Sequence, residues 1–573
     1  MNQTRVFLIF AWLMVATLLW MEWGKEKSAP PAPAVTAASA AATASTVPGA
    51  TVPTAAAAAG KGLVPAAPAL PGATPTATVA APSAAQTVTV TTDVLKVVLD
   101  GGTLHRADLL KYPSEAADDS APVRLLAEDA NNYFVAQSGW VSQNGATPTH
   151  EGGFVPESAQ RDYVLANGAK EIAVPFVWTG ANGVTIRRTY VFQHSGYAVT
   201  VRDEVINAGA APWQGSVYRQ LARVPRALTR SGPMNAEQYS FQGAAWYSEA
   251  EKYDKRKFDK FVDEGPLNLK VTGGWVAMLQ HHFFAAWIPG ANDQTEFSLA
   301  TANTNGGMPQ YLIRDIGPGV NVAPGAKAQT TARLWIGPKL VKAMEAQNVP
   351  GLERAVDWSS YSIMATMANA IFWLLSKLHD LFGNWGWSII GLVVLIKLAM
   401  YPLSAAQYRS MAKMRKFQPR IEQLKERYGE DKQKFQMAMM ELYKKEKINP
   451  VGGCLPILVQ MPVFLALYWV LLESVELRHA PWMLWIHDLT ARDPFFVLPL
   501  INIAVMWATQ KLTPTPGMDP MQKKMMQLMP LVFGVMFAFF PAGLVLYWIT
   551  NSGLGLLQQW WMTKRYAEAP AKA

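Results

Sequence analysis

The character of this chain is set by its longest apolar stretch, which reads MMQLMPLVFGVMFAFFPAGLVLYWITNSGLGLLQQWW at residues 525–561. A single helix of about 37 residues would be about 55 Å long at 1.5 Å per residue. The hydrocarbon core of a bilayer is only about 30 Å thick. Pro541 and Gly543 interrupt the stretch and favour a fold-back there. We therefore predict two short membrane spans, at residues 525–540 and 541–562.

The composition also favours a membrane protein. Half of the 573 residues are apolar and only 16% are charged, whereas soluble globular chains carry about 25% charged residues. Cys454 is the one cysteine of the sequence, which excludes intramolecular disulfides, iron–sulfur clusters and cysteine-based zinc sites. The sequence holds no metalloprotease, lipase or phosphate-loop motif. We expect no enzymatic activity, no cofactor and no metal.

Other apolar segments raise the predicted number of spans to six. The first lies in an N-terminal anchor, residues 1–27, where Trp20 and Trp23 follow the apolar run. Bulky aromatic residues suit a membrane interface and fit poorly in a signal-peptidase site, which favours an uncleaved anchor over a cleaved signal. The other three predicted spans are residues 384–405, 451–473 and 494–511.

Three regions lie between the first and second predicted spans. Residues 28–86 are almost entirely Ala, Pro, Thr, Ser, Val and Gly, which predicts a disordered linker. Residues 87–350 alternate polar and β-branched side chains between turn residues, which predicts a large extracytoplasmic all-β sandwich. Residues 351–383 repeat apolar residues at spacings of three and four but end in a polar run. They predict an amphipathic helix in the membrane interface.

His281 and His282 are the most tempting catalytic or metal-binding pair of the predicted β-domain. Neighbouring residues of a strand point to opposite faces, so we expect that the pair does not chelate one ion. One histidine facing the core and the other facing out is the favoured interpretation. A membrane-anchored periplasmic carbohydrate-active protein stays open as an alternative function, and it would require a cleft with paired carboxylates.

Basic residues concentrate beside the spans, and they account for the net charge of +9. Twelve of them lie between residues 405 and 450: Arg409, Lys413, Arg415, Lys416, Arg420, Lys425, Arg427, Lys432, Lys434, Lys444, Lys445 and Lys447. The loop at 474–493 holds only Arg478 and Arg492. The positive-inside rule then places the basic segment, the loop at 512–524 and the tail at 563–573 in the cytoplasm. Six spans put both termini inside and the β-domain outside, and nucleic acid is not an expected partner.

Residues 406–450 have the pattern of a cytoplasmic helical hairpin. Apolar residues recur every three or four positions, Gly429 breaks the helix, and the repeat continues after it, as in an antiparallel coiled coil. The hairpin is rich in methionine: Met411, Met414, Met437, Met439 and Met440. These side chains either pack within the hairpin or form an adaptable surface for apolar segments of a partner.

Lys397 is the most informative single residue, because an ionisable group inside a span costs a few kcal/mol and is by default a functional candidate. The alternative is snorkelling toward the cytoplasmic interface, which lies about 10 Å away. Each later span also carries a polar group, and such groups face one another or water and not lipid. We predict a wet, positively charged cavity within the helices, lined by Lys397, Gln460, Met461, Asn502, Tyr547 and Trp548.

Longer motifs resemble the YidC family of bacterial membrane-protein insertases over nearly the whole chain. They are MYPLS (400–404), QYRSMAKM (407–414), NPVGGCLP (449–456), QMP (460–462), WIHDL (485–489), FPAGLVLYW (540–548), EKY (251–253) and GGWVAMLQ (273–280). The resemblance implies a periplasmic β-super-sandwich, a five-helix insertase core, and a groove open to the cytoplasm and to lipid. It also implies a location in the bacterial inner membrane, with nascent membrane proteins, the Sec translocon and the ribosome as partners.

One residue departs from this family, in which the basic residue of the groove is typically arginine where this chain has Lys397. Lysine loses its proton more easily when desolvated and lacks the bidentate fork of arginine. The implied mechanism has no chemical step. The acidic tail of an incoming protein is drawn toward Lys397, and its apolar segment leaves sideways into lipid. A secondary transporter is the other alternative, although it would require repeated halves that the sequence lacks.

Overall fold

The computed structural model describes residues 86–567 except 118, 130–131, 144, 227–239, 262, 304–308, 359–361, 429–430, 447–454 and 513–519. The predicted anchor at 1–27 lies outside the described residues, as do the predicted linker apart from Gln86 and the end of the predicted tail. The side chains of residues 409–416 are also outside the description, and they include Met411 and Met414.

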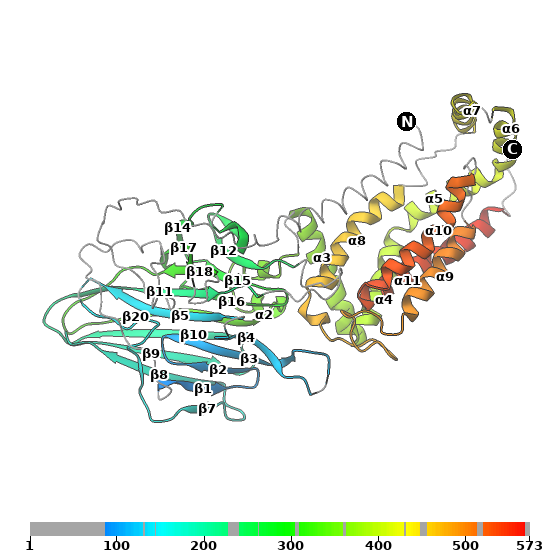
Figure 1. The fold of residues 1–573 in the computed structure, drawn as a ribbon. Coiled ribbons are helices and arrows are strands. Elements are labelled where there is room, and N and C mark those ends of the chain that lie inside the picture. The colour runs from blue at the N-terminus through cyan, green and yellow to red at the C-terminus, as the bar shows by residue number, and fades with distance from the viewer. Residues whose placement is uncertain are drawn as a thin grey trace, which may run out of the picture.

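Two large β-sheets make up the N-terminal part of the described chain (Figure 1). One has 11 strands in the order β14-β17-β18-β11-β5-β3-β2-β1-β7, with β4 on β3 and β19 on β11. The other has nine strands in the order β13-β12-β15-β16-β20-β10-β9-β8-β6. Their bounds are β1 (Val88–Thr91), β2 (Leu95–Leu99), β3 (Thr103–Pro113), β4 (Pro122–Leu126), β5 (Phe134–Ser142), β6 (Val155–Pro156), β7 (Asp162–Val164), β8 (Glu171–Thr179), β9 (Val184–Gln193), β10 (Ala198–Asn207), β11 (Trp213–Arg223), β12 (Gly243–Ser248), β13 (Lys252–Lys257), β14 (Asn268–Thr272), β15 (Trp275–Leu279), β16 (Phe283–Ile288), β17 (Gln294–Asn303), β18 (Pro309–Ile316), β19 (Val320–Val322) and β20 (Lys327–Pro338).

Some strands bury every second side chain, whereas β5, β12, β15 and β16 are buried along their whole length. In β10, which pairs with β9 and β20, Val199, Val201 and Val205 are buried, while Arg202 is exposed. Aromatic side chains supply much of the buried apolar area. Those fully buried include Trp140, Trp213, Trp246, Trp275, Trp287 and Trp335. The prediction of a β-sheet-rich region ahead of the helices is therefore confirmed.

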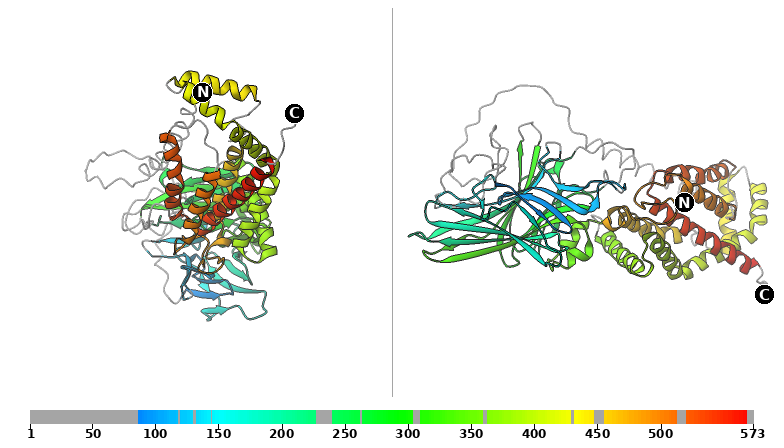
Figure 2. Two further views of the ribbon diagram at one scale, coloured as in Figure 1. Left: turned by 90° about the vertical axis from the view of Figure 1, so that its right-hand side faces the viewer. Right: turned by 90° about the horizontal axis from the view of Figure 1, so that it is seen from below.

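The helices follow the sheets along the chain and lie beside them, as the right-hand view of Figure 2 shows. Helices α6 and α7 lie at the end of the molecule that is remote from the sheets (Figure 1). The helix bounds are α2 (Val341–Glu345), α3 (Ser362–Phe382), α4 (Trp385–Ala399), α5 (Tyr401–Lys416), α6 (Gln418–Tyr428), α7 (Lys432–Lys445), α8 (Leu455–Glu473), α9 (Val497–Leu512), α10 (Pro520–Phe537) and α11 (Ala542–Ala567), with 3-10 turns η3 (Phe258–Lys260), η4 (Leu352–Val356) and η6 (Val475–Leu477).

Within the described part of the chain, no single helix has both the length and the hydropathy needed to cross a membrane. Only Trp385–Ala399 and Tyr401–Tyr408 reach that standard together, and they are bent by 64°. The bend has a local cause, because Pro402 has no N–H to donate to the Leu398 carbonyl. The predicted span at 384–405 is thus divided between α4 and α5, and the number of spans stays a prediction.

The long apolar stretch is also broken, close to the predicted point. Helix α10 ends at Phe537 and α11 begins at Ala542. Backbone N–H groups at this break bond to the loop between α8 and α9. Ala542 donates to the Ala491 carbonyl at 2.7 Å, and Gly543 donates to the Leu489 carbonyl at 2.9 Å. The loop therefore fixes the start of α11.

His281 and His282 lie in the turn between β15 and β16, so the expectation of opposite faces is wrong. Their rings stack at 3.7 Å, and both Nε2 atoms bond to the Leu472 carbonyl oxygen, at 2.8 and 3.2 Å. The alternation rule fails here because it applies to extended strands and not to the turns that join them. The pair satisfies a carbonyl in the last turn of α8, which has no partner within the helix.

Candidate functional site

Lys397 lies in the last turn of α4 and is partly buried. It forms no hydrogen bond or ion pair with another residue that the structure describes. Its Nζ atom is 3.6 Å from the position that a Cβ on Gly555 of α11 would occupy. The absence of a side chain at Gly555 therefore leaves room for the lysine against the face of α11.

A third helix reaches the same point. The Tyr408 hydroxyl of α5 donates to the Gly555 carbonyl at 3.1 Å. It also lies 4.0 Å from the position of a Cβ on Gly555. Lys397, Tyr408 and Gly555 thus bring α4, α5 and α11 together around one basic group. Sequence reasoning missed Tyr408 and Gly555.

A second polar cluster joins α8 to α11. The Gln460 Nε2 atom of α8 donates to Asn551 Oδ1 at 2.6 Å, and its amide also interacts with the Tyr547 hydroxyl. The Tyr547 ring is buried and stacks on Phe464 with 6.1 Å between ring centroids. The structure therefore brings together two of the predicted site residues, Gln460 and Tyr547.

Tyr547, Asn551 and Gly555 are spaced four residues apart on α11, so they share one face of that helix. We call these three residues the α11 polar stripe. The Lys397 cluster and the Gln460 cluster meet this stripe about one helical turn, or about 6 Å, apart. The two clusters form a continuous polar track along one helix. The four-residue spacing was the signal in the sequence that could have identified Gly555.

The other predicted residues occupy different surroundings. Asn502 of α9 is fully buried, and its Oδ1 atom accepts no hydrogen bond from the described residues. Trp548 packs on Phe464 at 4.9 Å, and its Nε1 atom is likewise buried without a described partner. Met461 is 45% exposed. No described hydrogen bond connects Asn502, Trp548 or Met461 to the α11 polar stripe, although α9 packs against α11.

The methionines of the hairpin divide into two groups. Met439 is buried in a small core with Ile421 and Tyr443, which Phe417, Phe435 and Leu442 extend. Met437 and Met440 are 60% and 63% exposed. The packing interpretation therefore holds for Met439, whereas Met437 and Met440 remain available to a partner.

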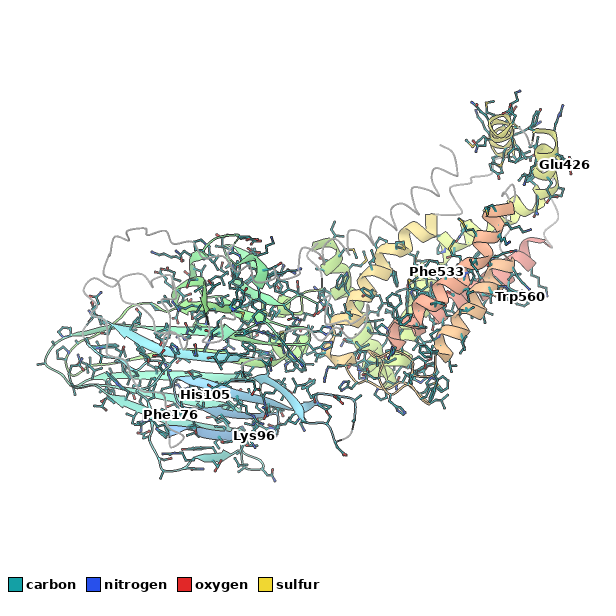
Figure 3. The ribbon with its side chains drawn as sticks, in the orientation of Figure 1. Lys96, His105, Phe176, Glu426, Phe533 and Trp560 are labelled. Carbon is teal, nitrogen blue, oxygen red and sulfur yellow. The ribbon has the colours of Figure 1, made fainter. Side chains whose placement is uncertain are left out.

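Large apolar side chains cover the outside of the helices. On α10, Leu528, Leu531, Val532 and Val535 are more than half exposed. Trp560, near the end of α11, is 57% exposed (Figure 3). Contiguous apolar surface is rare on soluble monomers and marks contact with a membrane or an apolar partner. A polar track inside and an apolar surface outside are the two halves expected of a helical membrane core.

Known proteins resemble the chain along its whole length. Residues 377–569 match the family described as "60Kd inner membrane protein", and residues 87–374 match the "YidC periplasmic domain". The membrane protein insertase YidC of Stenotrophomonas maltophilia is 58% identical over 579 residues, which cover 100% of this chain and 98% of that protein. The YidC of Xanthomonas campestris is 57% identical over 582 residues, covering 100% and 99%.

A solved structure also aligns with the chain. It is an active YidC insertase with its first transmembrane domain resolved, at a TM-score of 0.37 and 19% sequence identity. The alignment covers 83% of this chain and 92% of that one. The family assignment rests on the two matched family regions and on the full-length relatives above. On that evidence, this chain belongs to the YidC family of membrane protein insertases.

Proposed function

We propose that this chain inserts integral membrane proteins into the bacterial inner membrane and helps them fold, through a polar groove that opens to the cytoplasm and to lipid. The observation that supports this most directly is Lys397, a basic group without a described partner, placed against the α11 polar stripe. A structural lysine in such a place would be paired, because an uncompensated buried charge is costly. Lys397 is instead available to a charge that arrives from outside.

The groove acts by lowering the cost of moving a polar tail across the membrane. An acidic tail gains Coulombic attraction to Lys397, and its amide groups gain hydrogen bonds from Gln460, Asn551 and Tyr547. These interactions replace part of the hydration that the tail loses. The apolar segment of the client then moves into lipid, and burial of its apolar surface drives the process. No covalent step is required, so the protein is not an enzyme.

The short helices add to this effect. Helix α9 has 16 residues, which corresponds to about 24 Å at 1.5 Å per residue, less than the roughly 30 Å of a hydrocarbon core. A helix shorter than the bilayer thins it locally, at a modest cost per ångström of mismatch. A thinner bilayer shortens the path that a polar tail must cross.

The exposed methionines of the hairpin are the proposed first contact for a client. Met437 and Met440 lie on α7, at the end of the molecule remote from the β-domain (Figure 1). Replacing both by serine should weaken crosslinking to nascent apolar segments severalfold, because flexible thioethers adapt to many apolar shapes. The matched variant Met439→Ser should instead destabilise the hairpin. Normal crosslinking in the folded double variant would contradict the contact.

The proposed topology follows from charge. The basic hairpin and both termini are placed in the cytoplasm, the β-domain in the periplasm, and five helices in the insertase core. This orientation presents the hairpin and Lys397 to chains that emerge on the cytoplasmic side. The ribosome and the Sec translocon are proposed partners there, and the protein is proposed to act either alone or with the translocon.

The test is insertion into liposomes that contain only this purified chain. A small client with one apolar segment and a short acidic tail should become protected from protease on the far side. Liposomes with the Lys397→Glu variant serve as the control, because repulsion of the acidic tail should reduce protection. Equal protection with the chain, with the variant and with empty liposomes would overturn the proposal.

A further inference from the structure

A cavity of about 790 Å³ lies where the β-domain meets the helices, and we call it the junction cavity. The β-domain contributes polar lining such as Arg124, Asn132 and Gln280. The helical part contributes Leu471 and Leu472 from the end of α8 and Pro541, which directly precedes α11. The segment after α8 adds Arg478, His479 and Thr490, and the β-domain adds the apolar Val123 and Phe283. The lining therefore combines polar and apolar side chains, which suits a ligand with a charged group and an apolar tail.

Three arginines from three separate segments line this cavity: Arg124, Arg226 and Arg478. Arg124 is paired through Nε with Asp108 at 3.0 Å, and Arg226 makes no hydrogen bond or ion pair with a described residue. Glu115 and Asp129 also line the cavity, but neither forms an ion pair with these arginines within the described residues. Arginine guanidinium groups are frequent ligands of phosphate, and of these three Arg226 is the one without a described partner.

Arg478 connects the two sides of the cavity. Its guanidinium donates to the Pro113 and Ser114 carbonyls at 2.7 and 2.9 Å and lies over the Phe283 ring. These contacts hold the end of the β3 strand against the segment that follows α8. Arg478 is therefore unsuitable for a test of binding, because its loss would also separate the walls of the cavity.

Three histidines line the cavity, and burial lowers the pKa of each of them. His281 and His282 add no positive charge at neutral pH. Burial lowers the pKa of His281 to about 4 and holds the pKa of His282 well below its ordinary value. Both imidazoles use Nε2 to bond to the Leu472 carbonyl. They form a rigid neutral wall, and the attraction for an anion comes from the arginines.

We propose that the junction cavity binds the phosphate-bearing headgroup of a phospholipid from the periplasmic leaflet. The inference rests on the proposed topology, which places the end of α8 and the start of α11 at the periplasmic membrane surface. The apolar lining from these helices favours a lipid over free phosphate, because inorganic phosphate has no apolar part that could be buried against it. The bound lipid would link the β-domain to the bilayer beside the helical core.

The test measures binding of dihexanoyl phosphatidylglycerol to the delipidated full-length protein in detergent, by calorimetry. Arg226→Gln should weaken binding about tenfold or more, since one charge-assisted phosphate contact is lost. The matched control is Arg202→Gln, which removes an exposed arginine of β10 outside the cavity and should leave binding unchanged. Arg124→Gln provides a second cavity variant, and thermal unfolding checks that each protein is folded.

Two further ligands identify the source of the phosphate. Dihexanoylglycerol, which lacks phosphate, and inorganic phosphate should both bind much more weakly than the phospholipid. Equal binding of either one, or equal binding by the folded Arg226→Gln variant, would overturn the inference. Client insertion is measured separately on the same proteins. Wild-type protein that inserts clients but binds no phospholipid would refute the lipid site alone, whereas binding without insertion would refute the proposed function.

Discussion

The β-sandwich and the helices differ in how each holds a basic group away from solvent. In the sandwich, Arg188 is fully buried and donates to both carboxylate oxygens of Asp203, at 2.7 and 2.6 Å. It also donates to the Gly101 and Ser138 carbonyls, each at 3.0 Å. Trp140 Nε1 donates to Asp203 at 2.8 Å. The network is closed, with the charge compensated inside the domain.

In the helices, the basic group Lys397 is not compensated in this way. Lys397, Asn502 Oδ1 and Trp548 Nε1 have no partner among the described residues. Unpartnered buried atoms also occur in the sandwich, Trp213 Nε1 and Trp275 Nε1 among them, so the contrast concerns the charged groups. Arg188 is compensated by a carboxylate of its own domain, whereas Lys397 has no described partner. An uncompensated charge is costly to bury, and under the proposed function a client supplies the missing partner.

The largest expected effect is a loss of stability when the Arg188–Asp203 pair is broken. Arg188→Met leaves Asp203 as a buried, unpaired carboxylate, and we expect the free energy of unfolding to fall by about 3–5 kcal/mol. The neighbouring residue provides the control. Arg187 forms an exposed pair with Glu157, and Arg187→Met should cost less than about 1 kcal/mol. Urea unfolding followed by tryptophan fluorescence measures both variants. Equal losses would show that the two arginines contribute alike.

Removing the charge of Lys397 should slow client insertion without lowering the stability of the protein. Lys397→Met keeps a similar length, so folding should be unaffected, while insertion of clients with acidic tails should slow. The interaction is worth about 1–3 kcal/mol in a wet groove, which corresponds to about 5- to 150-fold in rate. Lys397→Arg should retain activity, and Lys397→Glu should be the slowest. The measurement is the insertion rate of matched clients that differ only in tail charge.

Neutral tails provide the internal control for that experiment. Clients with neutral tails should be nearly indifferent to Lys397→Met, because they gain no Coulombic attraction. Equal slowing of neutral and acidic tails would mean that Lys397 hydrates or supports the groove without attracting the client.

The sequence predicted the sandwich well because alternation is a local property that burial preserves. The stretch at 199–205 largely alternates, and β10 buries its odd-numbered residues, Asp203 included. The histidine pair was mispredicted because the partner, the Leu472 carbonyl, lies about 190 residues away. Local alternation of side chains does not predict a turn that is stabilised by a contact with a distant helix.

The candidate site was predicted only in part for the same reason. Gln460 and Tyr547 are polar residues within apolar runs, and this contrast can be recognised from the sequence alone. Tyr408 and Gly555 are ordinary residues whose role comes from the crossing of α4, α5 and α11. The role of Gly555, which is to leave space for the Nζ atom of Lys397, becomes visible only in the three-dimensional structure.

His105 should give the sandwich a pH-dependent stability. Burial alone would lower the pKa of His105, but hydrogen bonds to Asp100 and Glu128 outweigh it and raise that pKa to about 9. The stabilisation is therefore complete below the unfolded value of about 6.5 and is lost as the pH rises through about 9. We expect a loss of about 1–2 kcal/mol between pH 6 and pH 10, since Glu128 is half exposed and screened.

Chemical unfolding at the two pH values measures this loss. His105→Gln should remove the part of the pH dependence that the protonated imidazole causes. An unchanged profile in that variant would assign the loss to other groups.

The smallest effect tests how Lys397 is positioned. Gly555→Val adds a side chain whose Cβ would lie 3.6 Å from Lys397 Nζ, and its γ-carbons would require the lysine to move. Gly553 lies on the same helix and has nothing within 4 Å of an added Cβ, so Gly553→Val is a matched control with the same change in helix propensity. The ratio of insertion rates for acidic and neutral tails should fall severalfold in Gly555→Val, less than in Lys397→Met, and stay unchanged in Gly553→Val. An equal change in both variants would mean that valine perturbs α11 itself, and Gly555 would then have no part in holding the charge in place.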